Sequence, residues 1–98
     1  MKNLKNKRPF SRDRMLNANR FKVAYAAMGT IDGVQTFDKE VQPLGMAVAF
    51  ILMCEAYGVA APDVFTAAGN IIVHTETKDA SPEIRAVKQY IQEELANG

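Results

Sequence analysis

The sequence predicts an all-α protein, a small bundle of three to four helices that follows a basic, flexible N-terminal arm. Three observations predict this class: apolar residues recur at helical spacing near the C-terminus, a long apolar run lies mid-chain, and Pro62-Asp63 and Pro82-Glu83 have the composition of helix starts. At 98 residues, the chain has the length of a single domain.

The N-terminal arm is expected at residues 1–10, and a single helical domain at residues 11–98. Leu4 and Phe10 are the large apolar residues of the arm, too few to offset the entropy lost on ordering it.

Charge is divided unevenly along the chain. Residues 1–22 hold eight basic groups and one acid, a net charge of +7, whereas the other 76 residues hold four basic groups and ten acids, a net charge of −6. The overall +1 therefore hides two parts of opposite charge.

The first helix is expected at residues 11–28, with Ser11 as its cap and Gly29 at its end. The alanines in this segment favour a helix. An alternative stays open, because apolar residues alternate with period two over residues 21–27 and a glycine-flanked loop follows. That pattern is typical of a β-hairpin over residues 21–37, which three helices would then follow.

The next helix is expected at residues 43–58, since Pro43 suits a first helical turn and Gly58 a helix end. Residues 44–54 contain no polar side chain. A helix that is apolar on every side is buried centrally or against another subunit. Three short partner helices cannot surround it, which predicts a homodimer or higher homo-oligomer. The expected interface residues are Leu44, Val48, Ile51 and Leu52.

Two further helices are expected to begin at Pro62-Asp63 and at Pro82-Glu83. Proline has the backbone angle of a first helical turn, and an acid there interacts favourably with the helix dipole. The last helix has the clearest amphipathic stripe, with apolar residues at spacings of three, four and four. These residues are Ile84, Val87, Ile91 and Leu95.

No motif predicts an enzyme, a cofactor or a metal site. Cys54 lies in an apolar run, so a catalytic pair with His74, the one histidine, would require a buried thiol to meet a helix end. The acids show no metal-ligand spacing. Glu55, which follows the apolar run, is expected to be exposed. We therefore expect a non-enzymatic protein.

The basic segment is the best candidate for a binding function. Clustered cations attract phosphates, and Phe10 and Phe21 offer rings that stack on bases, so the expected partner is anionic, with nucleic acid as the first candidate. A tail that neutralises the acidic remainder of the protein is the structural alternative. The expected contact residues are Lys5, Lys7, Arg8, Arg12, Arg14 and Arg20.

Two other function classes stay open. One is a small accessory protein, of the kind a virus or mobile element encodes, that binds and inhibits a host protein. The other is a membrane-inserted protein, which residues 41–62 suggest with their single charge, Glu55. The uninterrupted apolar run of 11 residues suits a core helix better than a membrane span. With a lone cysteine and no recognisable signal peptide, the expected location is the cytoplasm.

Overall fold

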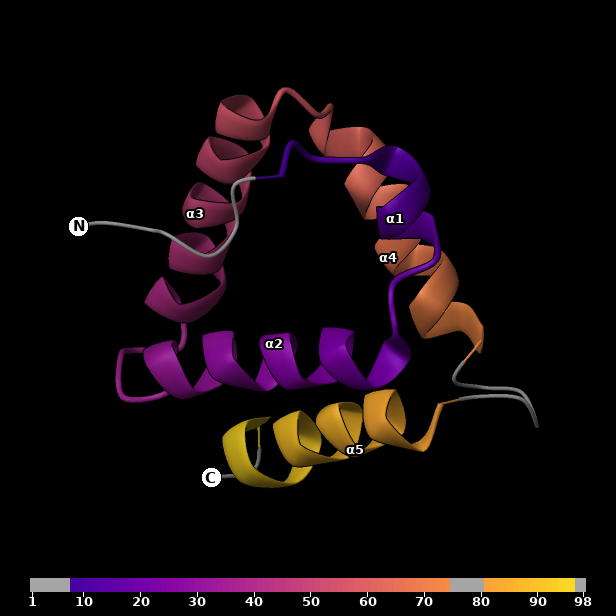
Figure 1. Ribbon diagram of the computed structural model, residues 1–98. Helices are drawn as coiled ribbons and strands as arrows, with labels where there is room; N and C mark the ends of the chain where they lie inside the picture. Colours follow the sequence, from indigo (N-terminus) through magenta and orange to yellow (C-terminus); the bar gives the residue numbers. More distant parts are fainter. Residues whose placement is uncertain (1–7, 75–80, 97–98) are drawn as a thin grey trace.

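The structure, a computed structural model, describes residues 8–74 and 81–96, in which every regular element is a helix. Figure 1 shows α2 (Arg20–Val34), α3 (Val41–Tyr57) and α4 (Ala61–Val73) as three sides of a triangle. The short α1 (Arg12–Leu16) lies beside α4. Helix α5 (Pro82–Tyr90) runs along α2 and continues into a π-helical turn, η2 (Ile91–Ala96). The all-α prediction is confirmed for the described residues, which contain five α-helices in place of three to four.

The first predicted helix is wrong in its bounds, because the structure divides residues 11–28 between α1 and α2. Ser11 caps α1 as predicted, its Oγ accepting a hydrogen bond of 3.2 Å from a backbone N–H of the first turn. Asn17 then ends α1, and Asn19 caps α2 by accepting a 3.0 Å hydrogen bond from the Lys22 backbone N–H. Asparagine side chains compete for backbone hydrogen bonds, which favours caps over helix interiors.

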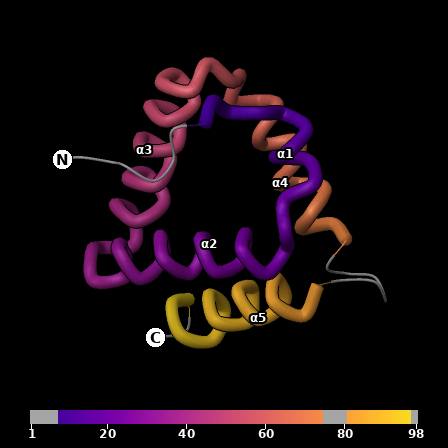
Figure 2. The backbone as a smooth tube through the Cα atoms, viewed as in Figure 1, coloured from indigo at the N-terminus to yellow at the C-terminus, as the bar shows by residue number. Residues whose placement is uncertain are grey.

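The hairpin alternative is also wrong, because α2 continues through Gly29 and ends only at Val34. A glycine inside a helix costs about 1 kcal/mol relative to alanine, and tertiary packing here outweighs that cost. Ala24 and Ile31 of α2 are buried, and both line hollows that they share with Val87 of α5. Figure 2 traces α2 and α5 alongside each other, although α3 and α4 separate them in the chain.

The central helix begins at Val41, two residues before the predicted start, because the Asp38 carbonyl accepts hydrogen bonds from the backbone N–H groups of Val41 and Gln42 (2.9 and 3.1 Å). Its end is as predicted. Gly58 follows Tyr57 with φ 71° and ψ 30°, the left-handed conformation that glycine adopts without steric cost.

Helices α4 and α5 also begin where the sequence predicts, each with a proline in its first turn. The Ser81 hydroxyl caps α5 by accepting a 3.4 Å hydrogen bond from the Ile84 N–H, and it donates one to the Glu83 carboxylate. That second bond, with a smaller effect from a backbone hydrogen bond, lowers the pKa of Glu83 below its ordinary value of 4.5.

The core of the described residues is thin. Ala24, Ile31 and Cys54 are the apolar residues buried within it, whereas a chain of this length buries roughly 65% of its surface in a typical fold. Helix α3 contributes only Cys54 to this core. It contacts α4 through Phe50 and Phe65, whose ring centroids are 4.9 Å apart. The central helix is therefore not buried within one chain.

Candidate functional site

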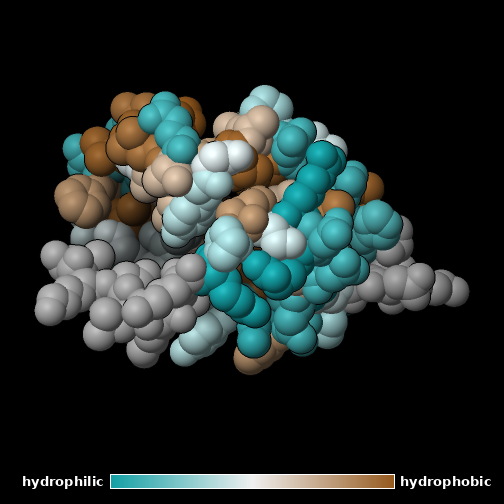
Figure 3. Space-filling model, turned by 45° about the horizontal axis from the view of Figure 1, so that its top comes forward, coloured by the Kyte–Doolittle hydropathy of each residue, from teal (hydrophilic) through white to brown (hydrophobic). Residues whose placement is uncertain are grey.

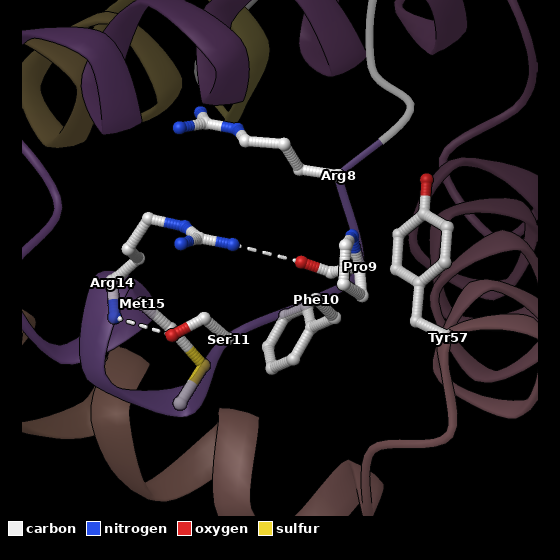
Figure 4. Close-up of a pocket in the computed structure, with 7 residues that line it drawn as sticks. All are labelled: Arg8, Pro9, Phe10, Ser11, Arg14, Met15 and Tyr57. Atoms are coloured by element: carbon white, nitrogen blue, oxygen red, sulfur yellow. Dashed lines mark hydrogen bonds between the residues drawn. The ribbon is translucent and has the colours of Figure 1, made fainter.

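Two of the predicted cationic residues, Arg8 and Arg14, line one open cleft between the N-terminal segment and the end of α3. The cleft has a volume of about 370 Å³. Figure 4 shows both guanidinium groups extending into the same space. We call this site the arginine cleft, and its lining residues are Arg8, Pro9, Phe10, Ser11, Arg14, Met15 and Tyr57.

The helix cap at Ser11 positions Arg14. It starts α1 so that Arg14 lies one turn later, and the Arg14 Nη2 donates a 2.8 Å hydrogen bond back to the Pro9 carbonyl (Figure 4). A guanidinium has five N–H donors, so this bond anchors the group and leaves other donors available. Within the described residues Arg8 makes no hydrogen bond and no ion pair. The cleft thus holds one anchored and one unengaged guanidinium.

An aromatic pair forms another wall of the cleft. The rings of Phe10 and Tyr57 stack with centroids 6.2 Å apart and planes inclined by 23°. Tyr57 is 57% exposed and Phe10 39% exposed. The sequence identified Phe10 as a stacking residue but gave no reason to choose Tyr57, whose one signal is its position directly before Gly58 at the end of α3.

Arg12 and Arg20, the other predicted contact residues that the structure describes, do not join Arg8 and Arg14. The Arg12 Nη1 lies 3.8 Å from the Asp63 Oδ2. The Arg20 Nη1 donates a 2.9 Å hydrogen bond to the Ala18 carbonyl. Neither arginine lines the cleft, and the remaining two predicted contact residues, Lys5 and Lys7, lie outside the described residues.

The predicted interface residues lie on one exposed face of α3. Their spacing of four, three and one places Leu44, Val48, Ile51 and Leu52 on the same side of a helix, and they are 65%, 51%, 48% and 58% exposed. We call this surface the α3 face. Figure 3 shows hydrophobic residues gathered on the side of the molecule where α3 lies. Contiguous exposed apolar surface of this kind marks interaction sites.

The residues considered for catalysis lie apart. Cys54 is buried in the last turn of α3, and the next helix, α4, carries His74 at its far end, about 20 Å along the helix axis. The His74 Nδ1 lies 2.6 Å from the Asn70 carbonyl, and Glu55 is exposed as predicted. Across residues 8–74 and 81–96, no cluster of His, Cys, Asp and Glu could hold a metal ion.

The described helices also include none that is long and apolar enough to cross a membrane. No protein family, curated protein or solved structure matches the chain. The arginine cleft and the α3 face must therefore be interpreted from their own chemistry.

Proposed function

We propose that this protein is a non-enzymatic binding protein that assembles as a homo-oligomer and contacts nucleic acid through its basic N-terminal segment. The observation that carries the proposal is the arginine cleft, where two guanidinium groups lie beside two exposed aromatic rings. Guanidinium groups bind phosphate oxygens, often through two parallel hydrogen bonds. Aromatic rings stack on bases. Nucleic acid is the anionic partner that offers both groups.

Long-range electrostatics support the same partner. Residues 1–22 carry a net charge of +7, against −6 for the remainder. Each phosphate that a cation neutralises releases condensed counterions, so that binding strengthens steeply as salt is lowered. The acidic remainder would repel the same polymer, which favours contact at the surface around the N-terminal segment.

The α3 face supports the homo-oligomer. A symmetric dimer uses the same patch on both subunits, so a second copy of the chain would cover this face with the same four apolar residues. Each of these side chains is about half exposed, and its burial would stabilise the assembly by about 1 kcal/mol. The thin core of the single chain gives a physical reason for such pairing, since a small fold gains its missing apolar burial from its partner.

Fluorescence anisotropy with a labelled oligonucleotide tests the nucleic-acid contact. We expect affinity to fall with salt, with a log–log slope of about −2 to −4. A variant with the six predicted contact residues replaced by glutamine lowers the net charge of residues 1–22 from +7 to +1. It should bind about tenfold more weakly or worse, and circular dichroism should show that it retains its helices. A wild-type protein that does not bind at low salt contradicts the proposal.

Light scattering tests the assembly. The mass should be a multiple of the 10.8 kDa chain. A monomer would instead favour the second candidate, an accessory protein whose exposed α3 face binds a different protein. Under that alternative, a partner protein is captured from host lysate even after nuclease treatment. Substitution of Ile51 by aspartate abolishes this capture.

A further inference from the structure

We infer that the arginine cleft binds single-stranded nucleic acid, with a base stacked on Tyr57 and a neighbouring phosphate held by Arg8 and Arg14. The inference rests on the proposed function and names the substrate class of that site. It depends on three features of the cleft: the exposed aromatic ring of Tyr57, two guanidinium groups beside it, and enough space for one nucleotide.

The ring of Tyr57 is available for stacking and held in place. Phe10 packs against it at 6.2 Å, and 57% of Tyr57 remains exposed. A base that adds to this stack must present its own face. In a duplex the base faces are covered by neighbouring base pairs, whereas in a single strand they are accessible. The aromatic wall therefore selects single strands.

The guanidinium groups lie where the backbone of such a strand would pass. Arg8 and Arg14 line the same cleft as Tyr57, and Arg14 is held by the Pro9 carbonyl. Its anchored position reduces the side-chain entropy lost on binding a phosphate. The volume of about 370 Å³ lies within the range of small-ligand sites. Base stacking and phosphate binding can thus occur together.

A second aromatic pair provides a matched control. Phe21 and Tyr25 on α2 stack with the same centroid distance, 6.2 Å, and are 60% and 76% exposed. The hollow beside them is lined by the acid Glu83 and by no arginine. The two pairs therefore offer similar rings, but only the Phe10–Tyr57 pair lines a hollow that also holds arginines. We expect this pair, and not Phe21–Tyr25, to bind a phosphate-linked base.

The test measures fluorescence anisotropy at low salt with two probes. One is a single-stranded oligothymidylate of about 16 nucleotides, and the other is the same strand paired with oligoadenylate. The wild-type protein should bind the single strand about tenfold more tightly. Tyr57→Ala should weaken single-strand binding about tenfold, whereas Tyr57→Phe and the control Tyr25→Ala should stay within about twofold. Arg14→Gln should weaken binding and reduce the salt slope by about 0.7, and Arg85→Gln, on α5, should not.

A second measurement applies even where Tyr57→Ala fails to fold. The chain has three tyrosines and no tryptophan, so the double variant Tyr25→Phe/Tyr90→Phe keeps Tyr57 as the only source of tyrosine emission. Stacking of a base should quench its emission. Unchanged emission at saturating oligothymidylate, or equal affinity for duplex and single strand, overturns the inference and leaves the proposed function standing. Absence of binding to either probe overturns the proposed function itself.

Discussion

The hydroxyl of Tyr90 donates a 2.7 Å hydrogen bond to the Oε1 of Gln35, a residue 55 positions earlier in the chain. The bond joins Tyr90, the last residue of α5, to Gln35, the C-cap residue of α2, whose backbone N–H donates to the Ile31 carbonyl. It therefore fixes the alignment of the two helices that enclose most of the buried residues.

Tyr90→Phe removes this bond and keeps the ring. The free energy of unfolding should fall by about 1 kcal/mol, because both side chains are partly buried and Gln35 loses a partner. Urea denaturation followed by circular dichroism measures the change. Tyr25→Phe, which removes a hydroxyl from a 76% exposed ring, is the control. Identical midpoints for the two variants would show that the hydrogen bond contributes nothing.

The two glycines Gly58 and Gly29 should respond in opposite directions to alanine. Gly58 has φ 71°, whereas Gly29 lies inside α2, and an added Cβ would meet nothing within 4 Å at either position. The backbone conformation at each glycine therefore decides whether alanine raises or lowers the stability. Gly58→Ala should destabilise by about 1 kcal/mol and Gly29→Ala should stabilise by about 0.5–1 kcal/mol. Thermal unfolding of both variants measures the effect, and shifts of the same sign refute the explanation.

Ser81 and Glu83 make the start of α5 sensitive to acid. Hydrogen bonding from Ser81 lowers the pKa of Glu83 in the folded protein below 4.5. A lowered folded pKa means that this contribution to stability is fully present above about pH 4.5 and is lost as the pH falls through the folded pKa. Ser81→Ala should return the pKa of Glu83 toward 4.5 and, by removing the cap, cost about 0.5–1 kcal/mol at neutral pH.

An NMR titration of the Glu83 carboxyl carbon checks the shift. Ser81→Thr keeps the hydroxyl and should keep the lowered pKa. An unchanged titration curve in Ser81→Ala would assign the shift to the backbone hydrogen bond instead.

Local signals in the sequence predicted the second half of the fold well. The helix ends at Gly58, Pro62 and Pro82 are as expected, because a left-handed glycine and a first-turn proline are set by backbone sterics alone. The N-terminal half was less predictable. Gly29 was expected to end a helix, yet α2 continues, since contact with α5 outweighs the intrinsic cost of a helical glycine.

The candidate site was also predicted only in part, because local sequence signals do not show which segments come into contact. Composition identified the basic segment, but it could not separate Arg8 and Arg14, which share a cleft, from Arg12 and Arg20, which contact other groups. That separation depends on where α1 starts and on its packing near α4. Tyr57 was missed because its role requires contact with Phe10, 47 positions away, and nothing in the intervening sequence predicts that contact.

The α3 face should control assembly. Ile51→Asp places a charge in the middle of this face, and a charge buried without a partner costs several kcal/mol. We expect the oligomer to dissociate, with a mass of one chain by light scattering. Phe37→Asp, which changes a 57% exposed residue between α2 and α3, is the control and should leave the mass unchanged. Retention of the oligomer in Ile51→Asp would place the interface elsewhere.

The ion pair between Arg12 and Asp63 should limit binding to nucleic acid. Both side chains are exposed, and their charged atoms lie 3.8 Å apart, so the pair adds only about 0–1 kcal/mol to stability. Asp63→Asn removes an acid beside the basic segment and frees Arg12 for a phosphate. Affinity for an oligonucleotide at low salt should rise by about two- to fivefold.

The gain should vanish at high salt, because exposed charges are then screened. Stability should fall by less than about 1 kcal/mol, since Asp63 also interacts with the dipole of α4 at its first turn. Anisotropy at two salt concentrations measures the effect. Asp38→Asn makes the same charge change in the connection between α2 and α3. An equal gain in this control would mean that net charge, and not release of Arg12, sets the affinity.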